Sequence, residues 1–125
     1  MPRDADDIRL ALDICRDLIR IDTTNYGDRE GPGERKAAEH VAADLRSIGF
    51  DSELRSTAGH PIVVGKSNGS AASKGPHVLF YGHYDVQPVD PLDLWQADPF
   101  EPALSEAGPG RKVIRGRGSA DDKGQ

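Results

Sequence analysis

The stretch that most constrains this chain is residues 77–85, where an apolar run leads directly into polar side chains. Residues 78–81 read Val-Leu-Phe-Tyr, a β-branched, aliphatic and aromatic composition that is typical of a buried strand. Gly82 follows, and a glycine here lets the backbone leave the strand in close contact with its surroundings. We therefore predict a central strand over residues 78–81 that carries the next residues to a fixed place.

His83 and Asp85 come directly after that glycine, two positions apart. In an extended chain these positions point the same way, so an imidazole and a carboxylate would enter one space at the end of the strand. Such a pair can begin a metal site or an acid–base site. The alternative, taking this segment alone, is a surface histidine and a turn aspartate beside Pro88.

A second unusual cluster occupies residues 116–124. It combines the glycines Gly116, Gly118 and Gly124 with the adjacent carboxylates Asp121 and Asp122, followed by Lys123. Neighbouring like charges are costly unless each has a partner, and a divalent cation is one such partner. The glycine spacing fits neither the dinucleotide fingerprint nor the P-loop. The alternative is a glycine-rich turn with solvated charges.

The rest of the chain predicts an α/β or α+β core. Apolar spacings of three and four predict helices over residues 4–20 and 33–48, the second ended by Gly49. Short strands are predicted over residues 50–54, 61–65 and 112–115. We interpret residues 21–32 as a solvated loop. Residues 86–111, which contain five prolines, should form a long, restrained and irregular loop.

Composition excludes several classes of protein. A length of 125 residues suits one domain, and Lys and Arg form no stripe in a chain of net charge −5, which argues against a nucleic-acid surface. No apolar run approaches the roughly 20 residues of a membrane helix, and the acidic N-terminus lacks the apolar core of a signal peptide. We expect a cytoplasmic protein. Cys15 is the sole cysteine, which precludes an intramolecular disulfide.

Taken together, three motifs in order resemble the metallopeptidase family of carnosinases, aminoacylases and acetylornithine deacetylase. They are the Gly-His-Tyr-Asp-Val-Gln-Pro-Val run at residues 82–89, the Trp…Asp-Pro-Phe at 95–100, and the Gly-Arg-Gly-Ser-Ala-Asp-Asp-Lys-Gly block at 116–124. The resemblance covers nearly the whole chain. It implies a partial zinc-peptidase catalytic domain of α/β class, with helices packed on a mixed central sheet. Residues 1–125 would be its N-terminal part, without the lid or dimerisation domain.

The resemblance also implies roles for particular residues. His83 would be a ligand of one of two divalent ions, zinc by preference, with manganese or cobalt as alternatives. Asp121 would bridge both ions. Asp85 would act in catalysis by holding the His83 ring in its ligating tautomer. The peptide bond between Asp121 and Asp122 would be cis. The supporting residues would be Gly82, Gly116, Gly118, Asp122 and Lys123.

The activity implied is hydrolysis of dipeptides or small peptides by a metal-activated water. The family's general-base glutamate and remaining ligands would lie beyond Gln125, so we expect the 125 residues alone to be inactive. Two alternatives stay open: an N-acyl amino acid deacylase of the same family, and a non-catalytic metal-binding or interaction module. Val86-Gln87-Pro88 favours the dipeptidase branch. The expected partner is a small peptide or N-acyl amino acid, without nucleic acid or membrane, and a longer protein could form a homodimer.

Overall fold

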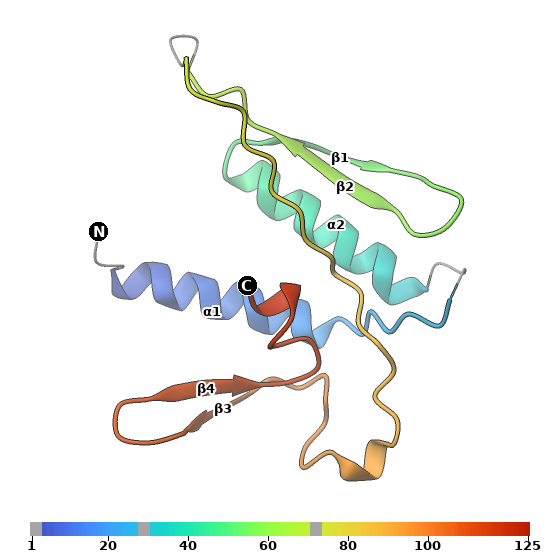
Figure 1. The fold of residues 1–125 in the computed structure, drawn as a ribbon, viewed down its shortest axis with the longest axis vertical. Helices are drawn as coiled ribbons and strands as arrows, with labels where there is room; N and C mark the ends of the chain where they lie inside the picture. The colour runs from blue at the N-terminus through green and yellow to red at the C-terminus, as the bar shows by residue number, and fades with distance from the viewer. Residues whose placement is uncertain (1–3, 28–30, 71–73) are drawn as a thin grey trace.

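The computed structural model describes residues 4–27, 31–70 and 74–125. Two helices come first along the chain, α1 (Ala5–Arg20) and α2 (Pro32–Ser47), and the hairpin of β1 (Asp51–Arg55) and β2 (Ile62–Lys66) follows (Figure 1). The later elements are the short helix η1 (Leu92–Leu94), strands β3 (Ala103–Glu106) and β4 (Lys112–Arg115), and the short helix η2 (Asp122–Gly124). Neither long helix has the length and apolar character that crossing a membrane requires, in the part of the chain described.

Helix α1 begins and ends where its sequence predicts. The Asp4 side chain accepts a hydrogen bond from the Asp6 backbone N–H (2.6 Å), as an N-cap should, and the helix runs to Arg20. Its predicted apolar stripe is only partly covered, since Cys15 and Ile19 are buried whereas Ile8 is 49% exposed. The C-terminal half of α1 is therefore the half that contributes to the core.

Helix α2 packs against the β1–β2 hairpin (Figure 1). The two strands pair antiparallel, from Asp51 opposite Lys66 to Arg55 opposite Ile62. Gly65 of β2 lies so close to the helix that a Cβ there would come within 2.9 Å of Leu45 Cδ1. Gly49 ends the helix with a φ of +93°, the left-handed cap that the sequence predicts.

The second hairpin shows that part of the predicted irregular loop is a strand. Within residues 86–111, β3 (Ala103–Glu106) pairs antiparallel with β4, with Leu104 opposite Ile114 and Ser105 opposite Val113. Ser105, Glu106 and the adjacent Pro102 weaken the strand signal in the sequence. The strand is stabilised by cross-strand contacts with its partner, which the local sequence does not show.

The predicted central strand over residues 78–81 is wrong for this structure. Among the described residues, this segment pairs with no strand. Leu79, Phe80 and Tyr81 are 93%, 90% and 89% exposed. The segment runs extended past α2, whereas β1 and β2 pair only with each other, as do β3 and β4 (Figure 1). The α/β class is confirmed, but the described strands form two separate antiparallel sheets in place of one mixed sheet.

The loop after α1 is also not the solvated connection that its composition predicts. Ile21, Thr23 and Thr24 are buried, and Thr24 forms a parallel bridge with Val86. The first turn of α2 lies directly on this segment, because a Cβ on Gly33 would come within 1.6 Å of the Asp22 carbonyl oxygen. Residues 21–24 thus join both helices to the segment that follows Gly82.

Substitution of Gly33 by alanine tests this close approach. Gly33→Ala should lower the free energy of unfolding by about 1–3 kcal/mol, because a backbone carbonyl must move to accommodate the methyl group. Gly59→Ala is the matched control, since the nearest heavy atom to a Cβ there is 4.0 Å away. Equal denaturant midpoints for the two variants would contradict the packing described.

The exposed run at residues 78–81 should drive association of the isolated chain. Unpaired backbone groups beside large apolar side chains template pairing between molecules. Light scattering should show concentration-dependent association that Phe80→Lys reduces. Leu94→Lys, at another exposed apolar position (76% exposed), should leave it unchanged. A monodisperse wild-type monomer that melts cooperatively would refute this expectation.

Candidate metal centre

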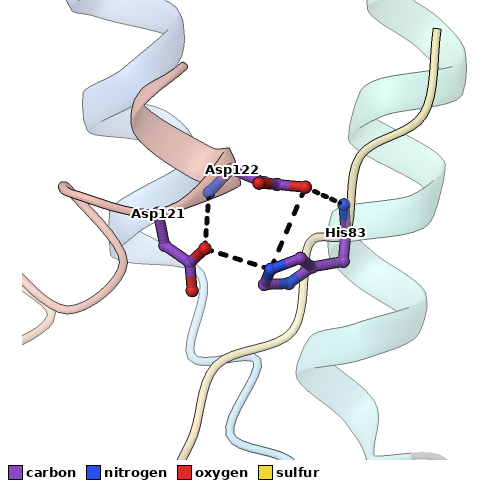
Figure 2. Close-up of side chains that lie close together, drawn as sticks. All are labelled: His83, Asp121 and Asp122. Carbon is purple, nitrogen blue, oxygen red and sulfur yellow. Dashed lines mark hydrogen bonds and ion pairs between the residues drawn. The ribbon is translucent and has the colours of Figure 1, made fainter.

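His83 lies between two carboxylates that come from different parts of the chain. Its Nε2 is 3.1 Å from Asp121 Oδ1, on the segment leading into η2 (Figure 2). Its Nδ1 is 3.1 Å from Asp85 Oδ1 and 3.2 Å from the Asp85 carbonyl oxygen. The structure thus brings together the imidazole and both of the aspartates that the sequence singles out.

Asp122 completes the cluster by bonding to the backbone. Its Oδ2 accepts a hydrogen bond from the His83 backbone N–H (2.7 Å) and lies 3.9 Å from His83 Nε2 (Figure 2). The Asp122 backbone N–H in turn donates to Asp121 Oδ1 (3.0 Å). The expectation of a cis bond between Asp121 and Asp122 is wrong here, since Asp90–Pro91 holds the only cis peptide among the described residues. A trans bond is the lower-energy form before a non-proline residue.

The glycines around the cluster permit close approach of these segments. A Cβ on Gly82 would lie 3.3 Å from Asp122 Oδ2, and one on Gly116 would lie 2.8 Å from Ile19 Cγ2 of α1. Gly118 has a φ of +87°, which a side chain would strain. The glycine-rich turn therefore fits against α1 while it presents its two carboxylates to His83.

Lys123 anchors the same turn from its buried side. The residue is 5% exposed, and its Nζ donates to the Ile21 carbonyl oxygen (3.0 Å) at the end of α1. Burial lowers the pKa of Lys123 to about 8, although the negative charges of Asp22 and Asp85 act to raise it. This bond links residues 102 positions apart and fixes the turn that carries Asp121 and Asp122.

The cluster opens into a pocket of about 520 Å³, whose lining includes His83, Asp85 and Asp121 together with Trp95 and Arg117. The Arg117 guanidinium donates to the carbonyl oxygens of Gln87 (2.9 Å) and Pro88 (3.2 Å). Arg117 thus holds one wall of the pocket in place, in keeping with a structural role.

The carboxylates set the protonation of the cluster. Partial burial alone would lower the pKa of His83, but the charges of Asp121, Asp122 and Asp85 outweigh it and raise the pKa. Desolvation would raise the pKa of Asp85, but the hydrogen bond from Asn25 and the charge of His83 lower it below its ordinary value. The site therefore favours a cation between its oxygens.

The donor set and its spacing fit a divalent ion. One nitrogen of His83 and one oxygen each from Asp121 and Asp122 all lie within 4.8 Å of one another. Ligand atoms about 2.0–2.2 Å from a tetrahedral zinc ion are roughly 3.3–3.6 Å apart, slightly more than the 3.1 Å between His83 Nε2 and Asp121 Oδ1.

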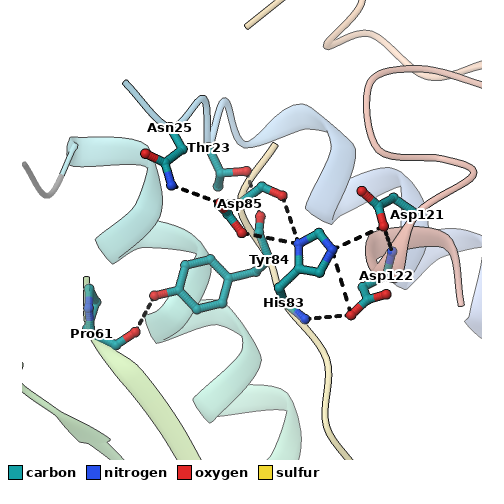
Figure 3. Close-up of polar contacts among 8 residues, drawn as sticks. All are labelled: Thr23, Asn25, Pro61, His83, Tyr84, Asp85, Asp121 and Asp122. Carbon is teal, nitrogen blue, oxygen red and sulfur yellow. Dashed lines mark hydrogen bonds and ion pairs between the residues drawn. The ribbon is translucent and has the colours of Figure 1, made fainter. Parts of the chain in front are cut away.

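Two residues of the site escaped the sequence analysis. Thr23 Oγ1 donates to the Tyr84 carbonyl oxygen (2.6 Å), and Asn25 Nδ2 donates to Asp85 Oδ2 (2.9 Å) (Figure 3). Both lie in the segment interpreted as a solvated loop. Thr and Asn side chains also form the local hydrogen bonds of turns, so these residue types by themselves did not reveal the buried contacts.

Comparison with known proteins identifies the family of the chain. Residues 79–125 match the sequence profile described as Peptidase family M20/M25/M40. The chain is also 31% identical, over 90% of its length, to the Cys-Gly metallodipeptidase DUG1 of Candida albicans. The chain belongs to this peptidase family.

Other members of the family are similar to the chain in sequence and in fold. A succinyl-diaminopimelate desuccinylase of Polynucleobacter necessarius is 33% identical over 74% of the chain. The solved structure of the dipeptidase Dug1p from Saccharomyces cerevisiae superposes with a TM-score of 0.75 and 26% identity, over 94% of this chain and 26% of that one. The chain spans about a quarter of the length of these relatives, 25% and 24% for the first two.

Metal binding at His83 should depend on pH. The pKa of His83 is raised from its ordinary 6.5, so in the metal-free protein Nε2 stays protonated above that pH. A cation must displace this proton. The affinity for Co²⁺, measured by calorimetry, should therefore fall as the pH decreases from about 8 to about 6, approaching a tenfold loss per pH unit below the pKa. An affinity that is constant over this range would show that His83 is not a ligand.

Proposed function

We propose that this chain supplies metal ligands to a metal-dependent hydrolase that cleaves the peptide bond of dipeptides or small peptides. The observation that carries the proposal is the convergence of His83 and Asp121, whose Nε2 and Oδ1 atoms lie 3.1 Å apart although 38 residues separate them. The named activity of the related metallodipeptidase supports a dipeptide as the substrate class.

In this proposal each residue of the cluster has a distinct task. His83 would hold one ion through Nε2, and the Asp121 carboxylate would help to hold both. Asp85 holds the imidazole from the other side, through the contact of 3.1 Å between its Oδ1 and His83 Nδ1. Zinc suits this donor set, and manganese or cobalt are alternatives. When bound, the ions would lower the pKa of a water that attacks the amide carbonyl.

The described lining of the pocket holds no glutamate, and its only acids are Asp85 and Asp121. Both of these carboxylates are committed to His83. Neither is therefore free to take a proton from a water, and a group outside this described lining would have to act as the general base. We infer that the 125 residues alone bind a metal ion without hydrolysing peptides.

A deacylase is the second candidate function, because a desuccinylase matches the chain at 33% identity. The two activities share every residue of the cluster, since both hydrolyse an amide. Val86-Gln87-Pro88 resembles the dipeptidase branch of the family, and Gln87 lines the pocket beside Val86, which favours the dipeptidase candidate.

Removal of either proposed ligand should weaken metal binding. His83→Ala and Asp121→Ala should each lower the affinity for Co²⁺ by about 10-fold or more, because each deletes a coordinating atom. His77→Ala removes an exposed imidazole near the cluster in sequence and is the control. Binding unchanged in the first two variants, or weakened equally in all three, would place the ion elsewhere.

Activity assays then test the reaction class. The chain alone should release no product from a panel of dipeptides in the presence of Zn²⁺ or Co²⁺. A longer protein that contains this chain should hydrolyse dipeptides in preference to N-succinyl and N-acetyl amino acids, and a chelator should abolish the activity. The reverse preference would favour the deacylase. Chelator-sensitive hydrolysis by the 125 residues would show that they contain their own general base.

A further inference from the structure

Residues 23–25 lie along residues 84–86 and hold them in register. The Asn25 backbone N–H donates to the Val86 carbonyl oxygen (2.8 Å), and the Val86 N–H donates to the Thr23 carbonyl oxygen (3.0 Å). Thr23 is fully buried, and its hydroxyl donates to the Tyr84 carbonyl oxygen (2.6 Å) (Figure 3). Asp85 is therefore delivered to a defined place beside the half-buried Asn25.

The orientation of the Asn25 amide follows from its two partners. Its Oδ1 accepts a hydrogen bond from the Gly27 backbone N–H (2.8 Å), so its Nδ2 is the end that faces Asp85 Oδ2 (2.9 Å). The opposite orientation would place two donors together at Gly27 and two acceptors together at Asp85. Asn25 is thus a fixed donor to this carboxylate.

Asp85 divides its two oxygens between two partners. Oδ2 accepts from Asn25, and Oδ1 lies 3.1 Å from His83 Nδ1 (Figure 3). A carboxylate held at both oxygens cannot rotate away from the ring. Two acceptors of Asp85, Oδ1 and the carbonyl oxygen, face Nδ1, whereas one acceptor, Asp121 Oδ1, faces Nε2. This geometry favours the neutral tautomer with its hydrogen on Nδ1, which leaves Nε2 for a ligand.

We propose that Asn25 is a positioning residue for the metal centre: its side-chain amide fixes the Asp85 carboxylate, which holds His83 in the Nδ1–H tautomer with Nε2 toward Asp121. This inference rests on the proposed function, in which Nε2 is a metal ligand. With Asn25 included, the site contains an amide, a carboxylate and an imidazole that contact one another in series. Asn25 and Asp85 are 60 positions apart in the sequence.

Two substitutions of Asn25 distinguish the effect of its hydrogen bond to Asp85 from that of its hydrogen bond with Gly27. Asn25→Asp has the same shape and keeps an acceptor for Gly27, but it removes the donor. Asn25→Leu removes both bonds without adding a charge. Thr57→Val is the matched control, because the Thr57 hydroxyl accepts from the Gly59 backbone N–H (3.0 Å) in a similar turn that lies outside the cluster.

Two measurements test whether Asn25 affects metal binding and the His83 ring. Calorimetry with Co²⁺ should show affinity reduced about 10- to 100-fold in both Asn25 variants, the usual loss when the support of a ligand is removed, and unchanged in Thr57→Val. In the metal-free protein, at a pH above the raised pKa of His83 where the ring is neutral, long-range ¹H–¹⁵N spectra should show Nδ1–H in the wild type and mixed tautomers in the variants. Unchanged backbone amide spectra elsewhere would confirm that the fold is intact.

The outcomes distinguish this inference from the proposed function. Wild-type affinity and unchanged His83 spectra in both Asn25 variants would overturn the positioning role while metal binding stands. Weakening in Asn25→Leu alone would assign the effect to the Gly27 bond and overturn it as well. A wild type that binds no Co²⁺ would refute the proposed function, and the ring spectra would still test the link from Asn25 to His83. If Asn25→Leu fails to fold, the isosteric Asn25→Asp carries the test.

Discussion

The site depends on main-chain hydrogen bonds that join three segments distant in sequence: residues 21–25, 82–86 and 116–125. Val86 bonds to both Thr23 and Asn25 through its backbone, and the buried Lys123 reaches the carbonyl oxygen of Ile21. Asp122 closes the arrangement by accepting the His83 backbone N–H. Because these bonds fix backbone and not only side chains, His83 is oriented before any ligand is bound. Preorganisation of this kind lowers the entropy cost of forming a metal site.

The electrostatics of the cluster follow from that arrangement. Three carboxylates surround one imidazole, with separations of 3.1 Å from Asp121, 3.1 Å from Asp85 and 3.9 Å from Asp122. Such a concentration of negative charge is stable only when each oxygen has a donor or a cation. Asp85 has Asn25 and Asp122 has a backbone N–H. Among the described residues, the partners of the Asp121 carboxylate are His83 and the Asp122 backbone N–H. This distribution favours Asp121 as the residue that shares a cation with His83.

Elements with a strong local signal agree with the structure. Helices α1 and α2 and strands β1, β2 and β4 lie within about one or two residues of their predicted bounds, because apolar periodicity, caps and alternation act over a few neighbours. Residues 78–81 have the composition of a buried strand, yet a strand also needs a partner, and no described strand pairs with them. Strand β3 shows the opposite: its short Ala-Leu-Ser-Glu sequence has little strand signal, yet it forms a strand because it pairs with β4.

The sequence by itself determined the residues of the candidate centre. His83, Asp85 and the Asp121–Asp122 pair stand out through spacing and through the glycines around them, both of which are local properties. Only the tertiary structure decided that these groups meet, that the Asp121–Asp122 peptide is trans, that Thr23 and Asn25 support them, and that Lys123 does so by bonding to the Ile21 carbonyl oxygen. The physical reason is that a hydrogen bond between residues 60 or 102 positions apart depends on the path of the whole intervening chain. Such a bond has no local signature, because the same polar residues serve equally well in a solvated turn.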